Sequence, residues 1–391
     1  MQKILEINLY SENYVLLGGY DRHYWRNIKG LRIEEHLRPQ SLKGLWRWWA
    51  RAYIAGALYD LIGNTDINKV ISITGEMLGD AERGASKVFL KIPHTTCRGR
   101  PTSIQKSNIG RINLLTSFGK TALRLVEDLR ATVILLERPR ANMSTEERAF
   151  LIGSLLTSLI LSGLGKGGRR GLGTFNLNIR YSATEEFRSL TRTGSSLLPD
   201  DYDQASKVIK QIIEKTLESA KKIASEKLKS KGARERASAT WPRIPAITLK
   251  EVAEQPDMCF FMLYMLKPKV STRGMHQMLV DVNNFVVRSK RGIDGLTRNK
   301  LAWILGLPRE QLGKGYFSWV ERRASPLIFA VHKRWFLASL FVSADWPQKI
   351  TWKGAQPLPI NVSSELPRAY KSLIDVFNAY FNRNYTIKRI L

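Results

Sequence analysis

Apolar and polar residues alternate near both ends of the first part of the chain, along 3–9 and 174–180. This period of two predicts two half-buried strands. From Ser41 the spacing changes, because apolar side chains return every three or four positions as far as Tyr53. That spacing predicts an amphipathic helix that Ser41 can cap.

Further elements lie between these two strands. Short apolar runs at 87–92 and 131–136 predict two more strands, and a capping box at 144–147 predicts a helix that continues to about residue 161. The order is then strand, helix, strand, strand, helix, strand, with a long insertion at 93–128. This is the order of the ferredoxin-like, or split βαβ, motif.

The second half of the chain is predicted to repeat this design in a more decorated form. Its expected elements are a strand at 260–266, a helix at 275–287, a hairpin of strands at 327–331 and 335–342, and a closing helix at 366–381. We therefore expect an α+β protein with two ferredoxin-like (RRM-like) βαββαβ domains that carry insertions. The expected division is an N-terminal domain at 1–181, a charged helical connection at 182–243 and a degenerate C-terminal domain at 244–391.

The composition is strongly basic, with 62 Lys and Arg against 34 Asp and Glu and a formal net charge of +28. Such an excess is typical of proteins that bind a densely negative partner, either nucleic acid or an anionic membrane surface. No apolar run reaches the roughly 18–20 residues that span a bilayer, and the N-terminus lacks the pattern of a secretion signal. We expect a cytoplasmic protein. Two cysteines and five scattered histidines predict neither a disulfide framework nor a metal site, and no cofactor is expected.

The stretch 163–173 holds six glycines and three cations in eleven residues. Glycine allows positive φ and close backbone approach, amide groups in such turns form anion sites, and arginine adds forked hydrogen bonds to phosphate. The stretch therefore predicts a clamp for an RNA backbone. The alternative is a flexible, solvated connection between a helix and a strand. The residues assigned to the clamp are Gly165, Lys166, Gly167, Gly168, Arg169, Arg170 and Gly171.

Two nucleotide-binding motifs are excluded for this glycine-rich stretch. Gly163, Gly165 and Gly168 match the spacing of the dinucleotide-binding motif, but that motif follows a strand and begins a helix. Here the stretch follows a predicted helix and precedes a predicted strand. The phosphate-binding loop motif requires Ser or Thr after its lysine, where this chain has Gly167.

The first predicted helix is a second candidate RNA-binding motif. Lys43, Arg47 and Arg51 recur every four residues and form a cationic ridge, which suits phosphates spaced along a strand. Trp48 lies off the apolar stripe and can offer a stacking face to a base. The alternatives are that Trp48 covers a small satellite core and that the cations form a solvated face. The candidate residues here are Arg38, Lys43, Arg47, Trp48 and Arg51.

Weaker signals lie elsewhere. An arginine pair at 322–323 is as consistent with ordinary solvated charge as with an RNA contact, and the same holds for a basic turn near residue 290. His23, in an N-terminal loop, is a weak candidate for a general acid or base in RNA cleavage, but no partner base accompanies it. No catalytic set is predicted. The candidate residues of the basic turn are Arg288, Lys290 and Arg291.

Three motifs together resemble the RAMP superfamily of CRISPR proteins, and more narrowly the subunit-one family of Cmr, or type III-B, effector complexes. They are the helix motif at 41–51, the Gly-Gly-Arg-Arg-Gly-Leu-Gly run at 167–173, and Arg-Ala-Ser-Pro-Leu at 323–327. The resemblance spans nearly the whole chain in order. It implies two ferredoxin-like domains and a place at the end of an RNA-guided complex. The implied partners are guide CRISPR RNA near its 3′ end, complementary target RNA and other Cmr subunits.

The resemblance also implies a non-catalytic role, because the target-cleaving aspartate of such complexes belongs to a different subunit. The chain lacks the aromatic surface motifs of a standard RRM, which argues against base reading by its sheet. Sequence specificity would then come from guide pairing. The main alternative is a metal-independent, CRISPR RNA-processing endoribonuclease of the same superfamily. A membrane-surface protein is a third hypothesis, but the cations are spread over loops and an aromatic helix rather than along one amphipathic face.

Overall fold

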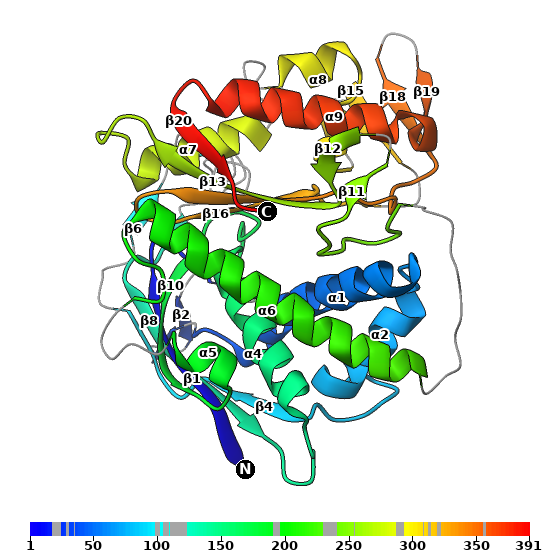
Figure 1. Ribbon diagram of the computed structural model, residues 1–391. Helices are drawn as coiled ribbons and strands as arrows, with labels where there is room; N and C mark the ends of the chain where they lie inside the picture. Colours follow the sequence, from blue (N-terminus) through cyan, green and yellow to red (C-terminus); the bar gives the residue numbers. More distant parts are fainter. Residues whose placement is uncertain are drawn as a thin grey trace.

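The computed structural model describes residues 1–17, 25–28, 31–34, 36–97, 102–104, 109, 123–190, 196–229, 241–253, 255–286, 293–307, 309–311, 314–318, 322–354 and 357–391. Within these residues the fold is mixed α+β and contains two five-stranded sheets, with a layer of helices between them (Figure 1). More helices cover the far side of the C-terminal sheet. The layers therefore alternate in the order sheet, helix, sheet, helix.

The N-terminal sheet has the strand order β10-β1-β8-β4, and β5 pairs with β8 beside β4. All these pairings are antiparallel. Along β8 every second residue is buried, so one face of the sheet packs on helices and the other does not. The alternation predicted at both ends of this region is confirmed. The strands are β1 (Gln2–Ser11), β4 (Val88–Lys91), β5 (Thr95–Cys97), β8 (Leu129–Glu137) and β10 (Phe175–Ser182).

Helices α1 and α4 cover the inner face of this sheet, and α6 packs across both of them. The predicted capping box is confirmed, because the Ser144 hydroxyl accepts a hydrogen bond from the Glu147 amide at 3.1 Å. The predicted cap of the first helix is wrong: α1 begins at Pro39, whose fixed φ suits a first helical turn. The helices are α1 (Pro39–Ile62), α2 (Ile67–Leu78), α4 (Thr145–Ile160), α5 (Glu185–Arg188) and α6 (Tyr202–Lys229).

The C-terminal sheet has the strand order β20-β13-β17-β16-β9. Its pairings are antiparallel except the last, in which β9 runs parallel to β16. Strand β9 comes from the glycine-rich stretch, so the N-terminal half of the chain supplies the edge of this sheet. The predicted hairpin is confirmed, whereas the sequence analysis assigned no strand after the closing helix, where β20 lies. The strands are β9 (Arg170–Gly171), β13 (Phe261–Pro268), β16 (Leu327–Val331), β17 (Phe336–Phe341) and β20 (Tyr385–Arg389).

Both faces of the C-terminal sheet are buried. Phe261 and Leu263 of β13 join the core that α1, α4 and α6 form with the N-terminal sheet. Met262 and Tyr264 point the other way and pack among residues of α7 (Met275–Val286) and α9 (Val362–Phe381). A strand buried on both faces reads as a continuous apolar run, which is how β13 appears in the sequence.

The remaining elements are short. They are β2 (Trp25–Ile28), β3 (Leu31–Glu34), β6 (Thr102–Ile104), β7 (Leu123–Leu125), β11 (Glu251–Val252), β12 (Gln255–Cys259), α8 (Asp294–Arg298), η1 (Ala302–Leu305), β14 (Arg309–Gln311), β15 (Lys314–Phe317), β18 (Lys349–Lys353) and β19 (Leu358–Asn361).

In the part of the chain that the structure describes, no helix is both long and apolar enough to cross a membrane.

Candidate nucleic-acid interface

The cations of the predicted ridge on α1 differ in their exposure to solvent. Arg51 is exposed, as is Arg38 just before the helix, whereas Lys43 and Arg47 are half-buried. The Arg47 guanidinium donates to the carbonyl oxygens of Leu78, at 2.8 Å, and of Gly79, at the end of α2. A cation at this place satisfies carbonyl groups that have no partner within their own helix. Arg47 therefore stabilises the end of α2, whatever else it binds.

Lys43 stands among other cations. Burial lowers the pKa of the Lys43 ammonium, and the positive charges of Arg47 and Arg138 lower it further. Arg138 is an exposed residue of the turn after β8. We call Lys43, Arg47 and Arg138 the cationic cluster. Arg138 was not predicted, although the run Arg-Pro-Arg directly after a buried strand was a usable signal.

The glycine-rich stretch forms tight turns, and several of its amide groups bond within the chain. Gly165, Gly167 and Gly171 have φ between +83° and +88°, which favours glycine. The amide of Gly163 donates to the Gly168 carbonyl at 3.0 Å, and the amide of Lys166 donates to the Leu16 carbonyl at 3.0 Å. These two amides bond within the chain itself, so they are not free to bind an anion; the predicted clamp stays a prediction. Gly165 is exposed, Lys166 and Gly167 are half-buried, and Gly168 is buried.

Arg169 connects the two halves of the molecule. One of its terminal nitrogens donates to the carbonyl oxygen of Ser325 at 2.9 Å, and the guanidinium carbon lies 4.9 Å from the ring centroid of Trp48. Burial lowers the pKa of Arg169 to about 10, with a further contribution from the charge of Arg323. The guanidinium is therefore still a cation at neutral pH. It lies in a partly desolvated contact between α1, the glycine-rich stretch and the C-terminal half.

Trp48 packs at the same contact. Its ring makes edge-to-face contacts with Trp49 and with Phe341 of β17, each with centroids 5.2 Å apart. Of the two interpretations of Trp48, these contacts match the one in which the ring covers a core. With Arg169 on its face, the indole is already engaged within the chain.

The next two residues of the glycine-rich stretch are fixed by asparagines. The Asn13 amide donates to the carbonyl oxygens of Gly171, at 2.7 Å, and Val331, at 2.5 Å, and thereby joins the segment after β1 to β9 and β16. The Asn283 amide of α7 donates to the carbonyl oxygen of Arg170 at 3.2 Å. Asn13 is buried, and the sequence analysis did not single it out. The stretch thus joins the two halves.

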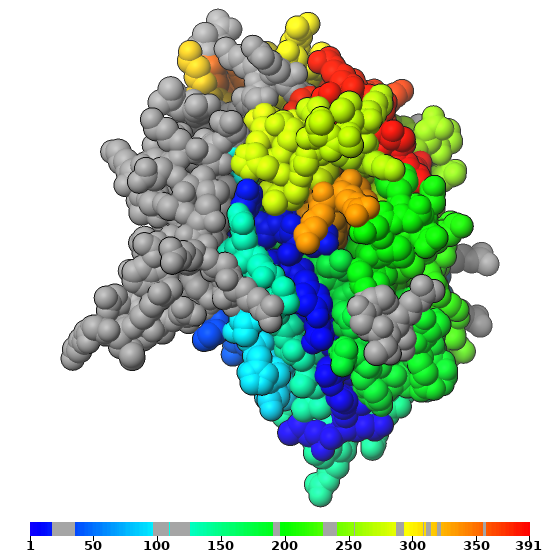
Figure 2. Space-filling model, turned by 90° about the vertical axis from the view of Figure 1, so that its left-hand side faces the viewer, coloured from blue at the N-terminus to red at the C-terminus, as the bar shows by residue number. Residues whose placement is uncertain are grey.

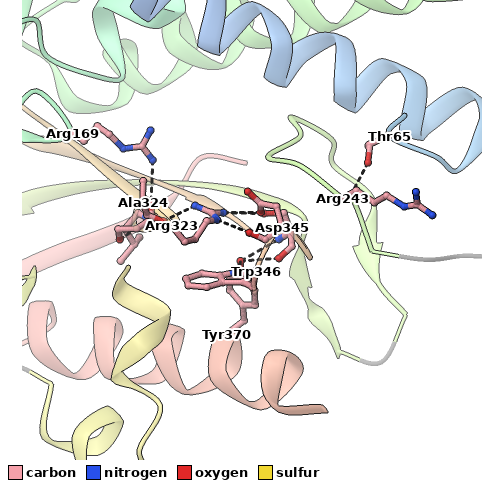
Figure 3. A network of polar contacts seen from close by, with 11 residues as sticks. Thr65, Arg169, Arg243, Arg323, Ala324, Asp345, Trp346 and Tyr370 are labelled. Carbon is pink, nitrogen blue, oxygen red and sulfur yellow. Dashed lines mark hydrogen bonds and ion pairs between the residues drawn. The ribbon is translucent and has the colours of Figure 1, made fainter. Parts of the chain in front are cut away.

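Arg323 is the centre of a second network in the C-terminal half (Figure 3). It is buried, donates to the Asp345 carboxylate at 2.8 Å, and lies 4.8 Å above the ring centroid of Trp346. The Trp346 indole in turn donates to the Tyr370 hydroxyl at 3.1 Å. Figure 3 shows Arg169 reaching toward the loop that carries Arg323 and Ala324. The arginine of the Arg-Ala-Ser-Pro-Leu motif is therefore engaged in holding the C-terminal half together.

Four predicted site residues lie outside the described part of the chain, namely His23, Arg288, Lys290 and Arg291. Among the described residues, no three His, Cys, Asp or Glu side chains gather as a metal site. The pair formed by buried His332 and half-buried Glu12, with 2.9 Å between Nδ1 and Oε2, also joins the two halves.

Residues 34–176 match the family model of the RAMP superfamily. In sequence, the chain is similar to the CRISPR system CMR subunit Cmr1 of Saccharolobus solfataricus, with 29% identity over 125 residues. That alignment covers 32% of this chain and 26% of the relative, so it spans about a quarter of the relative's length.

Two solved structures share the fold over almost the whole chain. Cmr1 from Pyrococcus furiosus, in its apo form, is similar with a TM-score of 0.54 and 19% identity, covering 98% of each chain. A chain of the type III-B Cmr-beta complex bound to cognate target RNA is similar with a TM-score of 0.57 and 13% identity, covering 95% of this chain and 100% of that one. Residues 34–176 thus resemble the RAMP superfamily in sequence, part of the chain resembles Cmr1 in sequence, and nearly the whole chain shares its fold.

Proposed function

We propose that this protein is a non-catalytic, RNA-binding subunit of a cytoplasmic type III-B CRISPR (Cmr) effector ribonucleoprotein. It contacts the guide RNA near its 3′ end and helps to capture the complementary target RNA. The observation that carries the proposal is the agreement of fold with Cmr1 over 98% of both chains. The net charge of +28 supports an RNA partner.

The two halves are proposed to be ferredoxin-like domains. Each half supplies the four strands of such a domain, and the two sheets have the orders β10-β1-β8-β4 and β20-β13-β17-β16. Numbered by their order in each half, the strands lie in the same sequence in both sheets: fourth, first, third, second. The proposed division keeps 1–181, 182–243 and 244–391. In this arrangement α6 belongs to the layer between the sheets rather than to an open linker, since Ile209 and Ile212 are buried in the N-terminal core.

The proposed phosphate contacts are cations that still reach the surface: Arg38, Lys43, Arg51, Arg138 and Lys166. Lys43 supports this choice most directly, because a lysine whose pKa is lowered by burial and by neighbouring cations gains from a nearby phosphate. Such contacts recognise charge and shape rather than sequence, which leaves sequence recognition to the guide. Arg169 and Trp48 contribute indirectly, because their contact holds α1, the glycine-rich stretch and the C-terminal half together.

The alternative function is metal-independent cleavage of CRISPR RNA with His23 as the acid or base. Incubation of the purified chain with labelled repeat RNA, without metal, distinguishes the two functions. We expect the RNA to remain intact. Cleavage at one position that is lost in a His23→Ala variant would overturn the non-catalytic proposal.

The main proposal is tested by purifying the native complex through a tag on this chain. We expect other Cmr subunits and guide RNA to be recovered, and ultraviolet crosslinks from this chain to fall in the 3′ portion of the guide and on target RNA. Crosslinks confined to the 5′ end of the guide, or recovery of the chain without RNA, would contradict it.

A further inference from the structure

The outer face of the N-terminal sheet is the one large sheet face, within the described residues, that neither helices nor the other half of the molecule covers. The inner face packs on α1 and α4, and both faces of the C-terminal sheet are buried. Figure 2 shows the outer face with β1 running down its middle, between β8 and β10.

This face carries exposed aromatic rings. Among the described residues, the aromatic side chains that are more than a third exposed are Tyr10, Phe89 and Tyr181, at 37%, 41% and 39%. They lie on β1, β4 and β10, where the strand register sets them opposite Arg130, Leu136 and Glu6, none of which is buried, so all three point to the outer face. Exposed aromatic residues gathered on one face indicate a binding surface rather than chance exposure.

Each ring has a cation beside its face. The Arg130 guanidinium carbon lies 5.6 Å from the ring centroid of Tyr10, and the Lys3 ammonium lies 5.2 Å from that of Tyr181. The Arg138 guanidinium carbon lies 5.9 Å from the ring centroid of Phe89. A ring with an adjacent cation gives a base a stacking surface and gives the phosphate next to that base a counter-charge.

One end of the face is hollowed. A depression of about 200 Å³ is lined by Tyr10 and Arg130 together with polar side chains. Its volume is below the roughly 300–1,000 Å³ of pockets that enclose small molecules, so it suits one flat ring lying on an open face. The polar residues are Asn8, His94, Thr96 and Thr132, whose amide, imidazole and hydroxyl groups can hydrogen-bond the edge of a base.

The charge at the hollow favours a base over a phosphate. Arg130 is already paired with the Asp128 carboxylate, with 3.0 Å between Nε and Oδ1. Because this pairing already neutralises part of the Arg130 charge, the hollow itself suits a neutral base ring better than a phosphate. From Tyr10 to Lys3 the face extends along β1 for about 23 Å at the usual rise of a strand, long enough for more than one nucleotide.

We propose that this outer face, formed by Tyr10, Phe89 and Tyr181 with their cations, stacks unpaired bases of single-stranded RNA, and that the hollow beside Tyr10 holds one of them. The inference rests on the proposed function as an RNA-binding subunit and deepens it. It also revises the expectation that the sheet takes no part in base contacts. The three rings come from strands far apart in the sequence, so no local sequence motif predicts them.

The test compares two ligands, a labelled single-stranded oligouridine and a strand of the same length without bases. Binding of the full chain is measured by fluorescence anisotropy. A triple variant, Tyr10→Ala with Phe89→Ala and Tyr181→Ala, should bind oligouridine about tenfold more weakly or worse, since each stacked base contributes on that order. Its affinity for the strand without bases should be unchanged.

Three controls make the result specific. Tyr10→Phe should retain binding, because the ring remains. Leu249→Ala, an equally exposed apolar residue at 42% that lies outside this sheet, should have no effect. Lys43→Ala should weaken both ligands alike, since it removes a phosphate contact of the proposed function.

The outcomes separate the two proposals. If the triple variant binds oligouridine as well as the unmodified chain while Lys43→Ala weakens it, the stacking face is overturned and the proposed function stands. Equal affinity of the unmodified chain for both ligands would also overturn stacking. Unchanged RNA affinity with failure of the triple variant to enter the Cmr complex would make the face a protein-docking surface instead. No binding of either ligand by the unmodified chain would contradict the proposed function itself.

Discussion

The guanidinium group of Arg169 lies over the indole ring of Trp48, with 4.9 Å between the guanidinium carbon and the ring centroid. These residues come from the two motifs that the sequence analysis assigned to RNA, and they contact each other. Ser325 of the C-terminal half accepts a hydrogen bond from the same arginine. The pair therefore holds α1, the glycine-rich stretch and the C-terminal half together.

Arg169→Ala should lower the free energy of unfolding by about 2 kcal/mol, because it removes a hydrogen bond and a partly desolvated cation–π contact. Arg169→Lys should restore little, since an ammonium lacks the planar face that stacks on Trp48. Urea denaturation followed by tryptophan fluorescence measures both variants. Full stability of the alanine variant would show that the contact is incidental.

Lys43→Ala combined with Arg138→Ala should reduce the dependence of RNA affinity on salt. Each lost phosphate contact lowers the slope of log affinity against log salt by about 0.7 for a single strand, so the double variant should lose about 1.4. Affinity titrations at several salt concentrations measure the slope. Lys371→Ala, which removes an exposed cation on α9, is the matched control and should leave it unchanged. An unaltered slope in the double variant would exclude the cationic cluster as a phosphate site.

Stability should fall in acid through the pair formed by Glu12 and His332. Burial alone would raise the pKa of Glu12, but the hydrogen bond and charge of His332, together with Lys333, bring it below its ordinary value of 4.5. A carboxyl whose pKa is lower in the folded state stabilises the fold above its unfolded pKa, and this contribution is lost as the pH falls through the folded pKa. The loss should therefore begin as the pH drops below about 4.5.

Glu12→Gln is the variant that isolates this contribution. It should be less stable than the unmodified chain at neutral pH, and the difference should shrink as the pH falls below about 4.5. His332→Ala removes the imidazole partner of the half-buried Glu12 carboxylate, which keeps only the Lys333 amide, and should cost about 3 kcal/mol at neutral pH. Urea midpoints measured across the acid range provide the comparison. A constant difference between Glu12→Gln and the unmodified chain would assign the effect to packing.

Two glycine substitutions should act in opposite directions. At Gly171, φ is +87° and an added Cβ would lie 2.6 Å from the Val331 side chain, so Gly171→Ala should cost about 2–4 kcal/mol. At Gly44, in α1, an added Cβ meets nothing within 4 Å, so Gly44→Ala should stabilise by about 0.5–1 kcal/mol. Thermal unfolding of the two variants tests this contrast. Equal effects would mean that β9 does not need its observed backbone conformation.

Periodicity predicted the elements that bury a regular face. Strand β8 alternates along its whole length, and the capping box placed the start of α4 correctly. Strand β20 was missed because it lies at the sheet edge and has few buried residues. The assignment of Ser41 as a cap failed because Pro39 allows a helix to begin earlier.

The candidate site was harder to predict because exposure depends on distant partners. Arg169 and Ser325 are 156 residues apart in the chain, and no local pattern distinguishes an arginine that meets such a partner from one that faces solvent. Arg323 is likewise buried in a motif that looked solvated. Tyr10 was not predicted because its neighbours in the sequence are ordinary strand residues, whereas the run Arg-Pro-Arg that contains Arg138 was a signal that was not used.

The parallel pairing of β9 with β16 has a consequence for synthesis on the ribosome. Gly171 emerges well before Ala330, its partner in the register. At roughly 5–20 residues per second, the edge strand and its arginine wait on the order of ten to thirty seconds for the strand that covers them. During that interval the nascent chain presents an unpaired backbone edge, and a chaperone or an early RNA contact that occupies it would protect the chain from aggregation.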